Sequence, residues 1–339
     1  MKRFLFGSQW FLASAWLWLF ATTTLPVYSQ AESTSAGFDE RNRIVTFCAY
    51  NLRNYLKMPR SVDGAIQEKA LKPDKEIAPL IEILATIKPD ILGVCEIGDA
   101  EDLADLQARL KVRDIDLPHS EMGNGGDPTR RLALLSRFPI TSRNSQSELK
   151  YHIGDVILPM QRGILDATVA LRPNFEVRFL GVHFKSQREV PGMDQKLMRR
   201  NEAHLLRRHI ESILTTEPAT RLLAYGDFNE SKHEAALVEI EGVPGTDVSM
   251  MDVRLRDSRG ETWTHFWDAA DHYSRLDYCF VNRALQSDIK KPESFVYDPP
   301  NFYDASDHRP LVIKIDRGAA TSRARKKAKA TPGEAEEPR

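Results

Sequence analysis

The sequence predicts an α/β protein in which helices pack against the outer faces of β-sheet. Short apolar runs rich in β-branched residues recur along the chain from Arg43 onward, and such runs are typical of strands. Between some of these runs, apolar residues recur with the spacing of one helix face. The chain has 339 residues, of which 42% are hydrophobic, so it can bury a large core.

The expected strands are apolar segments bounded by polar or turn-forming residues. In chain order they lie at residues 43–50, 90–96, 132–136, 164–171, 177–184, 221–227, 275–281 and 310–315.

Two helices are expected between these strands. The first covers residues 72–89, where Pro73 stands ahead of apolar residues on one helical face. The second covers residues 193–214. The apolar stripe of the first helix is Ile77, Leu80, Ile81 and Leu84, and that of the second is Leu197, Leu205, Leu206, Ile210 and Leu214.

Residues 1–31 have the pattern of a secretory signal peptide. Lys2 and Arg3 precede an apolar stretch, and small residues that fit a cleavage site follow it. We therefore expect an exported protein, periplasmic or secreted, from which this segment is removed. Retention of the segment as a membrane anchor is the alternative.

One domain is expected over residues 38–316, followed by a disordered basic and acidic tail over residues 317–339, because the tail almost lacks large apolar residues. The basic run from Arg323 to Lys329 could contact a polyanion or be a solvated tail. The formal net charge is −1, so any basic surface must be local.

The three cysteines, Cys48, Cys95 and Cys279, each lie inside an expected strand. They are too few, and odd in number, for a disulfide framework. We expect small buried hydrophobic side chains rather than disulfides or catalytic thiols.

Polar side chains stand where several expected strands end. The segment "GDFN" follows an apolar run and places Asp227 and Asn229 at its tip. Asn51 ends the first strand. Glu96 directly follows an apolar run, where a carboxylate is costly to bury unless it binds a cation. A single Gly-Asp-x-Asn also suits an ordinary turn, so a functional interpretation depends on the other strand ends.

Those strand ends add imidazoles, acids and a cation. His183 and Lys185 are two residues apart and should share one face of a strand. Asp277 is embedded in apolar residues, and Asp307 and His308 precede the last strand. Without a serine or cysteine nucleophile motif, this set suits attack by water on an anionic phosphorus centre.

Oxygen ligands from Glu96 with Asn51 or Asp307 suit Mg²⁺ or Mn²⁺ rather than Zn²⁺. Arg162 and Lys185 are candidate phosphate contacts, although either could equally be solvated.

The sequence resembles the endonuclease/exonuclease/phosphatase family, which has the deoxyribonuclease-I-like fold. The resemblance rests on an ordered set of segments that spans the domain: "YNLRN", "PDILGVCEIG", "RLALLSRFPI", "GVHFKSQ", "GDFN", "SRLDY" and "SDHRPLV". It implies a four-layer α/β sandwich, in which two packed mixed sheets are flanked by helices, with a metal-dependent phosphoesterase site at the strand ends.

The resemblance also implies a role for each matching residue. Glu96 corresponds to the principal metal ligand, with Asn51 and Asp307 beside it. Asp227 corresponds to the base for the attacking water, and Asn229 to the residue that holds that water and a phosphate oxygen. The remaining correspondences are His183 and His308 as phosphate-binding histidines and Asp277 as the acid paired with His308.

Family membership leaves the substrate open. We expect a Mg²⁺-dependent phosphodiesterase, most consistent with a nuclease acting on DNA or RNA, and infer no stable protein partner. A sphingomyelinase-like or inositol-phosphate phosphoesterase is one alternative, and a catalytically inactive binding module is another.

The nuclease and lipid-cleaving hypotheses predict different surface residues. A nuclease would use basic residues along its groove, for which Arg130, Arg131, Arg199 and Arg200 are candidates. A lipid-cleaving enzyme would expose aromatic residues. The candidates are Trp263, Phe266, Trp267 and Tyr273. We expect these four to be packed, so membrane contact is not favoured.

Overall fold

The computed structural model describes residues 43–318, all of which fall within one compact unit. The expected signal peptide, residues 1–31, and the basic run of the tail lie outside the described residues. Within residues 43–318, no helix is long and apolar enough to cross a membrane.

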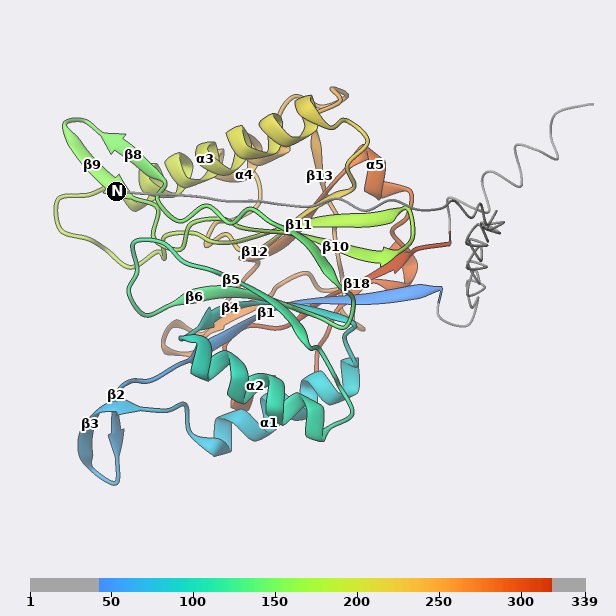
Figure 1. Ribbon diagram of the computed structural model, residues 1–339. Coiled ribbons are helices and arrows are strands. Elements are labelled where there is room, and N and C mark those ends of the chain that lie inside the picture. Colours follow the sequence, from blue (N-terminus) through green and yellow to red (C-terminus); the bar gives the residue numbers. More distant parts are fainter. Residues whose placement is uncertain (1–42, 319–339) are drawn as a thin grey trace, which may run out of the picture. The chain divides into compact units, whose positions relative to one another are not determined.

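The described chain contains two large mixed sheets (Figure 1). In spatial order, sheet I contains β17 (Phe295–Val296), β18 (Leu311–Asp316), β1 (Ile44–Tyr55), β4 (Ile91–Ile97), β6 (Arg131–Ser136) and β5 (His119–Gly123). Sheet II contains β13 (Met250–Asp252), β16 (Asp277–Asn282), β12 (Leu222–Asp227), β11 (Phe175–His183), β10 (Leu165–Arg172) and β7 (Ile140–Arg143). Every strand expected from the sequence is present.

Three two-stranded hairpins stand outside these sheets. They are β2 (Met58–Val62) with β3 (Ala65–Ala70), β8 (Lys150–Ile153) with β9 (Val156–Pro159), and β14 (His265–Trp267) with β15 (His272–Ser274).

Helices cover the outer face of each sheet, as Figure 1 shows. Sheet I carries α1 (Asp74–Ile87) and α2 (Ala100–Val112), and sheet II carries α3 (Gln195–Thr216) and α4 (Ala235–Glu241). Short helices complete the chain: α5 (Arg283–Gln286), α6 (Phe302–Ala305) and the 3₁₀ turns η2 (Asp268–Ala270) and η3 (Lys291–Glu293). The expected four-layer sandwich is confirmed.

The two sheets meet in an apolar core. The rings of Phe47 on β1 and Tyr225 on β12 lie 5.0 Å apart edge to face, which is a favourable aromatic geometry. Gly93 and Gly181 leave room for the Tyr225 ring, since a Cβ at Gly93 would lie 2.2 Å from it. Glycine at these two positions therefore allows the sheets to approach each other around this aromatic side chain.

The apolar stripe predicted for the first helix is buried at every position, but the stripe predicted for the second is partly wrong. Leu206, Ile210 and Leu214 are buried, whereas Leu197 is exposed. Met198 is buried instead, because it lies eight residues before Leu206 and so on the same face of the helix.

Helix α2 was not expected from the sequence. Asp99 caps it by accepting hydrogen bonds from the backbone of Glu101 and Asp102, and the Asp102 carboxylate accepts one from the Asp99 N–H. This reciprocal capping box has a sequence signature, although aspartate stands where Glu or Gln is usual.

Cys48, Cys95 and Cys279 are buried free thiols, as expected. Burial raises the pKa of each thiol, which makes them poor nucleophiles.

Candidate active site

Strand direction brings the polar strand ends to one edge of the sandwich. β1 runs parallel to β4 in sheet I, and β11 runs parallel to β12 in sheet II. Their outer neighbours, β18 and β16, run antiparallel, so they begin at the edge where the parallel pairs end. Residues at the ends of the parallel strands and at the starts of the antiparallel strands therefore share one edge.

On sheet II, three predicted site residues occupy one row across neighbouring strands. His183 is paired with Asp227, and Asp227 is paired with Asp277. Gly226 precedes the central aspartate with φ +140°, and a Cβ there would lie 1.9 Å from the Val182 carbonyl oxygen. The "GD" pair therefore allows the strand to end close to its neighbour with its carboxylate in the row.

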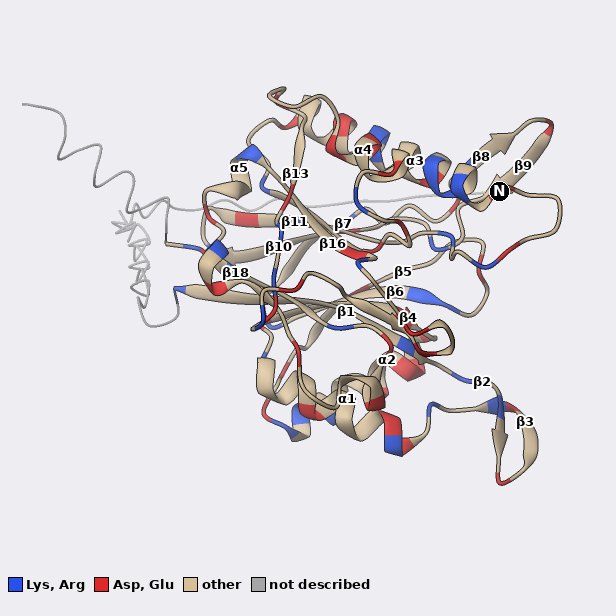
Figure 2. Cartoon of the chain, turned by 180° about the vertical axis from the view of Figure 1, so that it is seen from behind, with Lys and Arg blue, Asp and Glu red and all other residues tan. Residues whose placement is uncertain are grey.

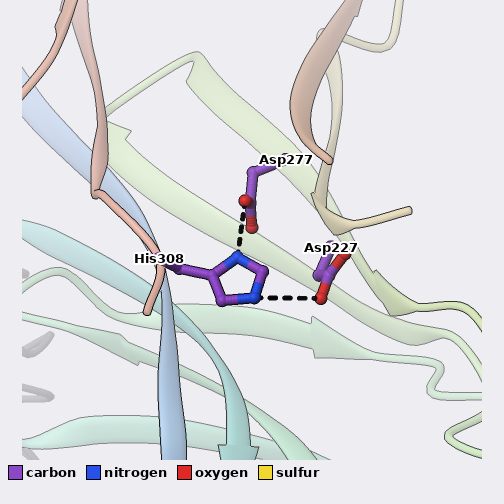
Figure 3. Close-up of side chains that lie close together, drawn as sticks. All are labelled: Asp227, Asp277 and His308. Carbon is purple, nitrogen blue, oxygen red and sulfur yellow. Dashed lines mark hydrogen bonds and ion pairs between the residues drawn. The ribbon is translucent and has the colours of Figure 1, made fainter. Parts of the chain in front are cut away.

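His308 joins this row from sheet I and lies between two aspartates (Figure 3). Its Nδ1 is 2.7 Å from an Asp277 oxygen, and its Nε2 is 3.6 Å from Asp227 Oδ2. Burial opposes protonation, but Asp277 and Asp227 outweigh it and raise the pKa of His308 well above its usual value. His308 is therefore a buried cation that directs Nε2 toward Asp227.

Asp227 is the centre of the site. Its Oδ1 accepts a hydrogen bond from the Asn229 backbone (2.8 Å), and its Oδ2 accepts one from Asn51 Nδ2 (3.1 Å). Burial raises the pKa of this carboxyl, against the opposing effect of the His308 cation. A raised pKa suits a group that accepts a proton near neutral pH.

His183 contacts the same carboxylate from the other side. Its Nε2 lies 3.6 Å from Asp227 Oδ2 and 3.9 Å from Glu96 Oε1. Burial, reinforced by the Arg162 and His308 cations, lowers the pKa of His183 well below its usual value. The pKa values of the two imidazoles are thus shifted in opposite directions, because carboxylates face His308, whereas burial and cations act on His183. His183 Nδ1 is buried without a partner in the described chain.

Glu96 points away from the β4 ladder because the strand is irregular at this position. Its φ is +62°, and the pairing of β4 with both neighbours shifts register here. Such a bulge redirects a side chain. Glu96 Oε2 accepts a hydrogen bond from the Asn54 N–H at 2.9 Å, while Oε1 lies 3.9 Å from His183 Nε2.

These contacts fit a hard divalent cation at Glu96. Glu96 and Asp307 line the same pocket. Asn51 Oδ1 accepts a hydrogen bond from the Arg53 N–H at 3.0 Å and keeps a second lone pair. An oxygen donor set of this kind suits Mg²⁺ or Mn²⁺.

Asp227, Asp277 and His308 form a second group with ligand-type atoms, which all lie within 4.8 Å of one another. In this group His308 Nδ1 is held at 2.7 Å by Asp277, and Asp227 Oδ1 accepts a backbone N–H. His308 and Asp277 are thus joined by a hydrogen bond, whereas His308 Nε2 and Asp227 Oδ2 face each other at 3.6 Å, beyond hydrogen-bond distance.

Asn229 supports the site from outside the pocket. Its backbone N–H orients Asp227, and its Nδ2 donates to the Phe184 carbonyl at 3.1 Å. This side chain is buried and holds the strand-end turn in place.

The structure separates Arg162 from Lys185. Arg162 is buried, lines the pocket with His183, and lies 3.3 Å from Asp127. The predicted shared strand face for His183 and Lys185 is wrong, because β11 ends at His183. The Lys185 ammonium instead donates to the carbonyls of Ser186 and Arg188.

The pocket in front of these groups has a volume of about 500 Å³. Its walls include three arginines that no sequence motif predicted, Arg53, Arg60 and Arg188. Arg60 comes from hairpin β2–β3, whose short exposed strands carry no site signal in the sequence.

Of the four arginines expected along a groove, only Arg130 lines this pocket. Arg131 donates to the Gly98 carbonyl, Arg200 is exposed on α3, and Arg199 is buried against Glu230 at 2.9 Å. Arg199 therefore has a structural role: its guanidinium group is buried and forms an ion pair with the buried Glu230 carboxylate.

The expectation that the aromatic residues are packed is only partly correct. Trp263 and Phe266 are half-buried and contact the ring of Tyr273. Trp267 and Tyr273 are 58% and 51% exposed on hairpin β14–β15. The hairpin is only two strands wide, so one of its faces has no sheet to pack against.

Glu202 on α3 holds two loops that border the site. It is fully buried, and its carboxylate accepts the backbone N–H of Lys185 at 2.6 Å and of Gln161 at 3.3 Å. Burial raises the pKa of Glu202 from 4.5 to about 7, although both hydrogen bonds lower it.

This shift predicts a pH dependence of stability. Between these two pKa values the folded protein keeps a proton that the unfolded chain releases, so the free energy of unfolding decreases as pH rises, by about 1.4 kcal/mol per unit of pKa difference. We expect the free energy of unfolding of the wild-type protein to decrease, relative to that of Glu202→Gln, from about pH 5 to about pH 8. Denaturant unfolding at a series of pH values measures both free energies. The exposed Glu148→Gln is the control, and parallel wild-type and Glu202→Gln curves would contradict the assignment.

Two mixed sheets lie between helical layers, and acids and imidazoles gather at one strand-end edge, a combination that suits hydrolysis of a phosphoester. The chain belongs to the Endonuclease/Exonuclease/phosphatase family, whose sequence profile matches residues 48–308. No curated protein matches the chain at a significant level of sequence similarity.

Solved structures share the fold at low sequence identity. Truncated TDP2 from Caenorhabditis elegans is 17% identical, with a TM-score of 0.53, and the match covers 80% of this chain and 97% of the truncated chain. The human Nocturnin catalytic domain, solved with a bound sulfate anion, is 15% identical, with a TM-score of 0.55 and coverage of 80% and 94%. A mannosyl-6-phosphatase from Bacteroides thetaiotaomicron is 18% identical, with a TM-score of 0.54 and coverage of 79% and 98%.

Proposed function

We propose that this chain is an exported, Mg²⁺- or Mn²⁺-dependent phosphodiesterase that hydrolyses nucleic acid. The observation that carries the proposal is the position of Asp227 Oδ2, which lies 3.6 Å from Nε2 of both His183 and His308, beside a pocket lined by arginines. The signal-peptide pattern of residues 1–31 supports export.

Asp227 is the proposed base. Its carboxylate is held on one side by Asn229 and on the other by Asn51, so it needs little reorganisation to accept a proton from water. Its raised pKa favours that transfer near neutral pH.

The two histidines are the proposed donors to the phosphoryl oxygens. His308 brings a full positive charge that Asp277 maintains, which stabilises the extra negative charge of the transition state. His183 brings a neutral N–H and so positions the phosphate without adding charge.

Glu96, with Asn51 and Asp307, would hold the cation. A divalent ion supplies neutralisation of phosphate charge at this position.

The surroundings of the pocket favour a polyanionic substrate. Arg53, Arg60, Arg130, Arg162 and Arg188 line it together with only three carboxylates, Glu76, Glu96 and Asp307, and arginine forks suit phosphate oxygens. The exposed Trp267 and Tyr273 are the observation that favours a lipid substrate, because exposed aromatic residues suit a membrane interface.

A substrate panel with and without EDTA tests this proposal. We expect the purified protein to degrade DNA or RNA with added Mg²⁺, to lose at least about 10²-fold in rate with EDTA, and to recover when Mg²⁺ is restored. Sphingomyelin and inositol phosphates serve as competing substrates. Release of phosphocholine without nucleic-acid degradation would replace the nuclease assignment with the lipid one, and no turnover of any substrate would favour an inactive binding module.

A further inference from the structure

The pocket extends beyond the catalytic acids to a group of arginines arranged around Asn54. The Asn54 carbonyl accepts a hydrogen bond from the Arg60 guanidinium at 2.7 Å, and its side-chain oxygen accepts one from Arg130 Nε at 2.8 Å. The backbone N–H of the same residue donates to Glu96. One residue therefore fixes two guanidinium groups beside the carboxylate proposed to bind the metal.

These guanidinium groups keep donors for a ligand. Arg60 Nε is buried without a hydrogen-bond partner among residues 43–318, although buried polar groups are normally paired. Arg130 meets Asp127 only at 3.9 Å through one terminal nitrogen. Both side chains line the pocket that contains His183 and His308.

The basic residues around these two arginines also favour an anionic ligand. Figure 2 shows basic segments on β2 and at the start of β6, which lie on the side where hairpin β2–β3 projects. Arg53 lines the same wall, 3.7 Å from Asp307. Two or three guanidinium groups together suit a dianion better than the single charge of a backbone phosphodiester.

We propose that Arg60 and Arg130, held on Asn54, bind a second phosphate, and that this phosphate is a monoester at the end of the substrate, close to the scissile phosphodiester. The inference rests on the phosphodiesterase function proposed above and narrows its substrate class to nucleic-acid ends that carry a terminal phosphate.

Glu76 supports recognition of an end rather than a continuing strand. This α1 carboxylate lines the pocket near Arg60 and is held 3.2 Å from the buried Lys72 ammonium, which also donates to the Arg53 carbonyl. A nucleic-acid backbone that continued past Arg60 would bring its next phosphate against this fixed carboxylate, which like-charge repulsion disfavours.

The first test compares short single strands of one sequence that carry a 5′-phosphate, a 3′-phosphate or hydroxyls at both ends. We expect kcat/KM of the wild-type protein to be at least about tenfold higher for one phosphorylated form than for the hydroxyl form. In Arg60→Ala this ratio should fall to about one to three, and in the exposed α3 variant Arg208→Ala it should stay at the wild-type value. Because both substrates are measured on one preparation, the ratio does not depend on the fraction of folded protein.

A second test measures binding without turnover. In Asp227→Asn protein with Ca²⁺, calorimetry should show at least about tenfold tighter binding of the preferred phosphorylated strand, and adding Arg60→Ala should remove that preference. Equal affinity for the phosphorylated and hydroxyl strands, or an end preference that survives in Arg60→Ala, would overturn the inference. If the wild-type protein turned over no strand, the proposed function would fail, while this binding comparison would still decide the subsite.

Discussion

Asp227→Asn is expected to lower kcat on the best substrate of the panel by about 10² to 10⁴-fold, since the substitution removes the proposed proton acceptor. Asparagine has nearly the same shape as aspartate, and its amide oxygen can still accept the hydrogen bond from the Asn229 N–H. It carries no charge and cannot take a proton from water. The loss should therefore appear in kcat, with a much smaller effect on KM.

The matched control for this prediction is Asp166→Asn. Asp166 is a fully buried aspartate on β10, paired with Arg178 at 2.6 Å and with His209 at 2.7 Å on the face covered by α3. Its replacement should lower stability but leave kcat per folded molecule unchanged. A kcat of Asp227→Asn within about tenfold of wild type would show that another group acts as the base.

The strand ends that build the site could be predicted because polar side chains stand directly before or after apolar runs. Asp227 and Glu96 stand out in the sequence as acids at the ends of buried strands, and both lie at the site edge. What the sequence does not contain is the row that pairs His183, Asp227 and Asp277. That row depends on which strands are neighbours, which is a property of sheet topology rather than of any local pattern.

The failures have physical causes of the same kind. Lys185 was placed on a strand face because an apolar run continues through Phe184, but β11 ends one residue earlier and the chain turns. Arg199 looked like a groove residue, yet the buried Glu230 partner lies 31 positions away in sequence. Arg60 has no local signal in the sequence, because its proposed role depends on a contact with Asn54 that forms only in the folded chain.

The same topology explains how one site shifts the pKa values of two histidines in opposite directions. Asp277 begins the strand next to Asp227 and lies beside His308, while His183 ends the strand on the other side, where Arg162 is close. The position of each histidine in the sheet thus determines which charged groups lie beside it. Because Asp277 lies beside His308, we expect these two residues to affect the reaction together, as one unit.

The second large effect on kcat is expected from replacing His308. His308→Ala should lower kcat by about 10² to 10⁴-fold, because it removes the cation that faces the transition state. Asp277→Asn should cost less, since the imidazole stays while its pKa falls. If the two act as one unit, the double variant should be no slower than His308→Ala alone, a non-additivity that a double-mutant cycle measures directly.

His209 provides the comparison for this cycle, because its Nε2 lies 2.7 Å from Asp166, which reproduces the distance of the His308 contact away from the pocket. His209→Ala removes a partly buried histidine–aspartate pair without touching the catalytic edge, so its effect should be on the unfolding free energy alone. Additive losses for His308→Ala and Asp277→Asn would mean that Asp277 acts on the reaction independently of the imidazole. If Asp277 acts only through the imidazole, Asp277→Asn should have no further effect on kcat once His308 has been replaced. Additive losses would therefore assign the two residues separate roles in the reaction.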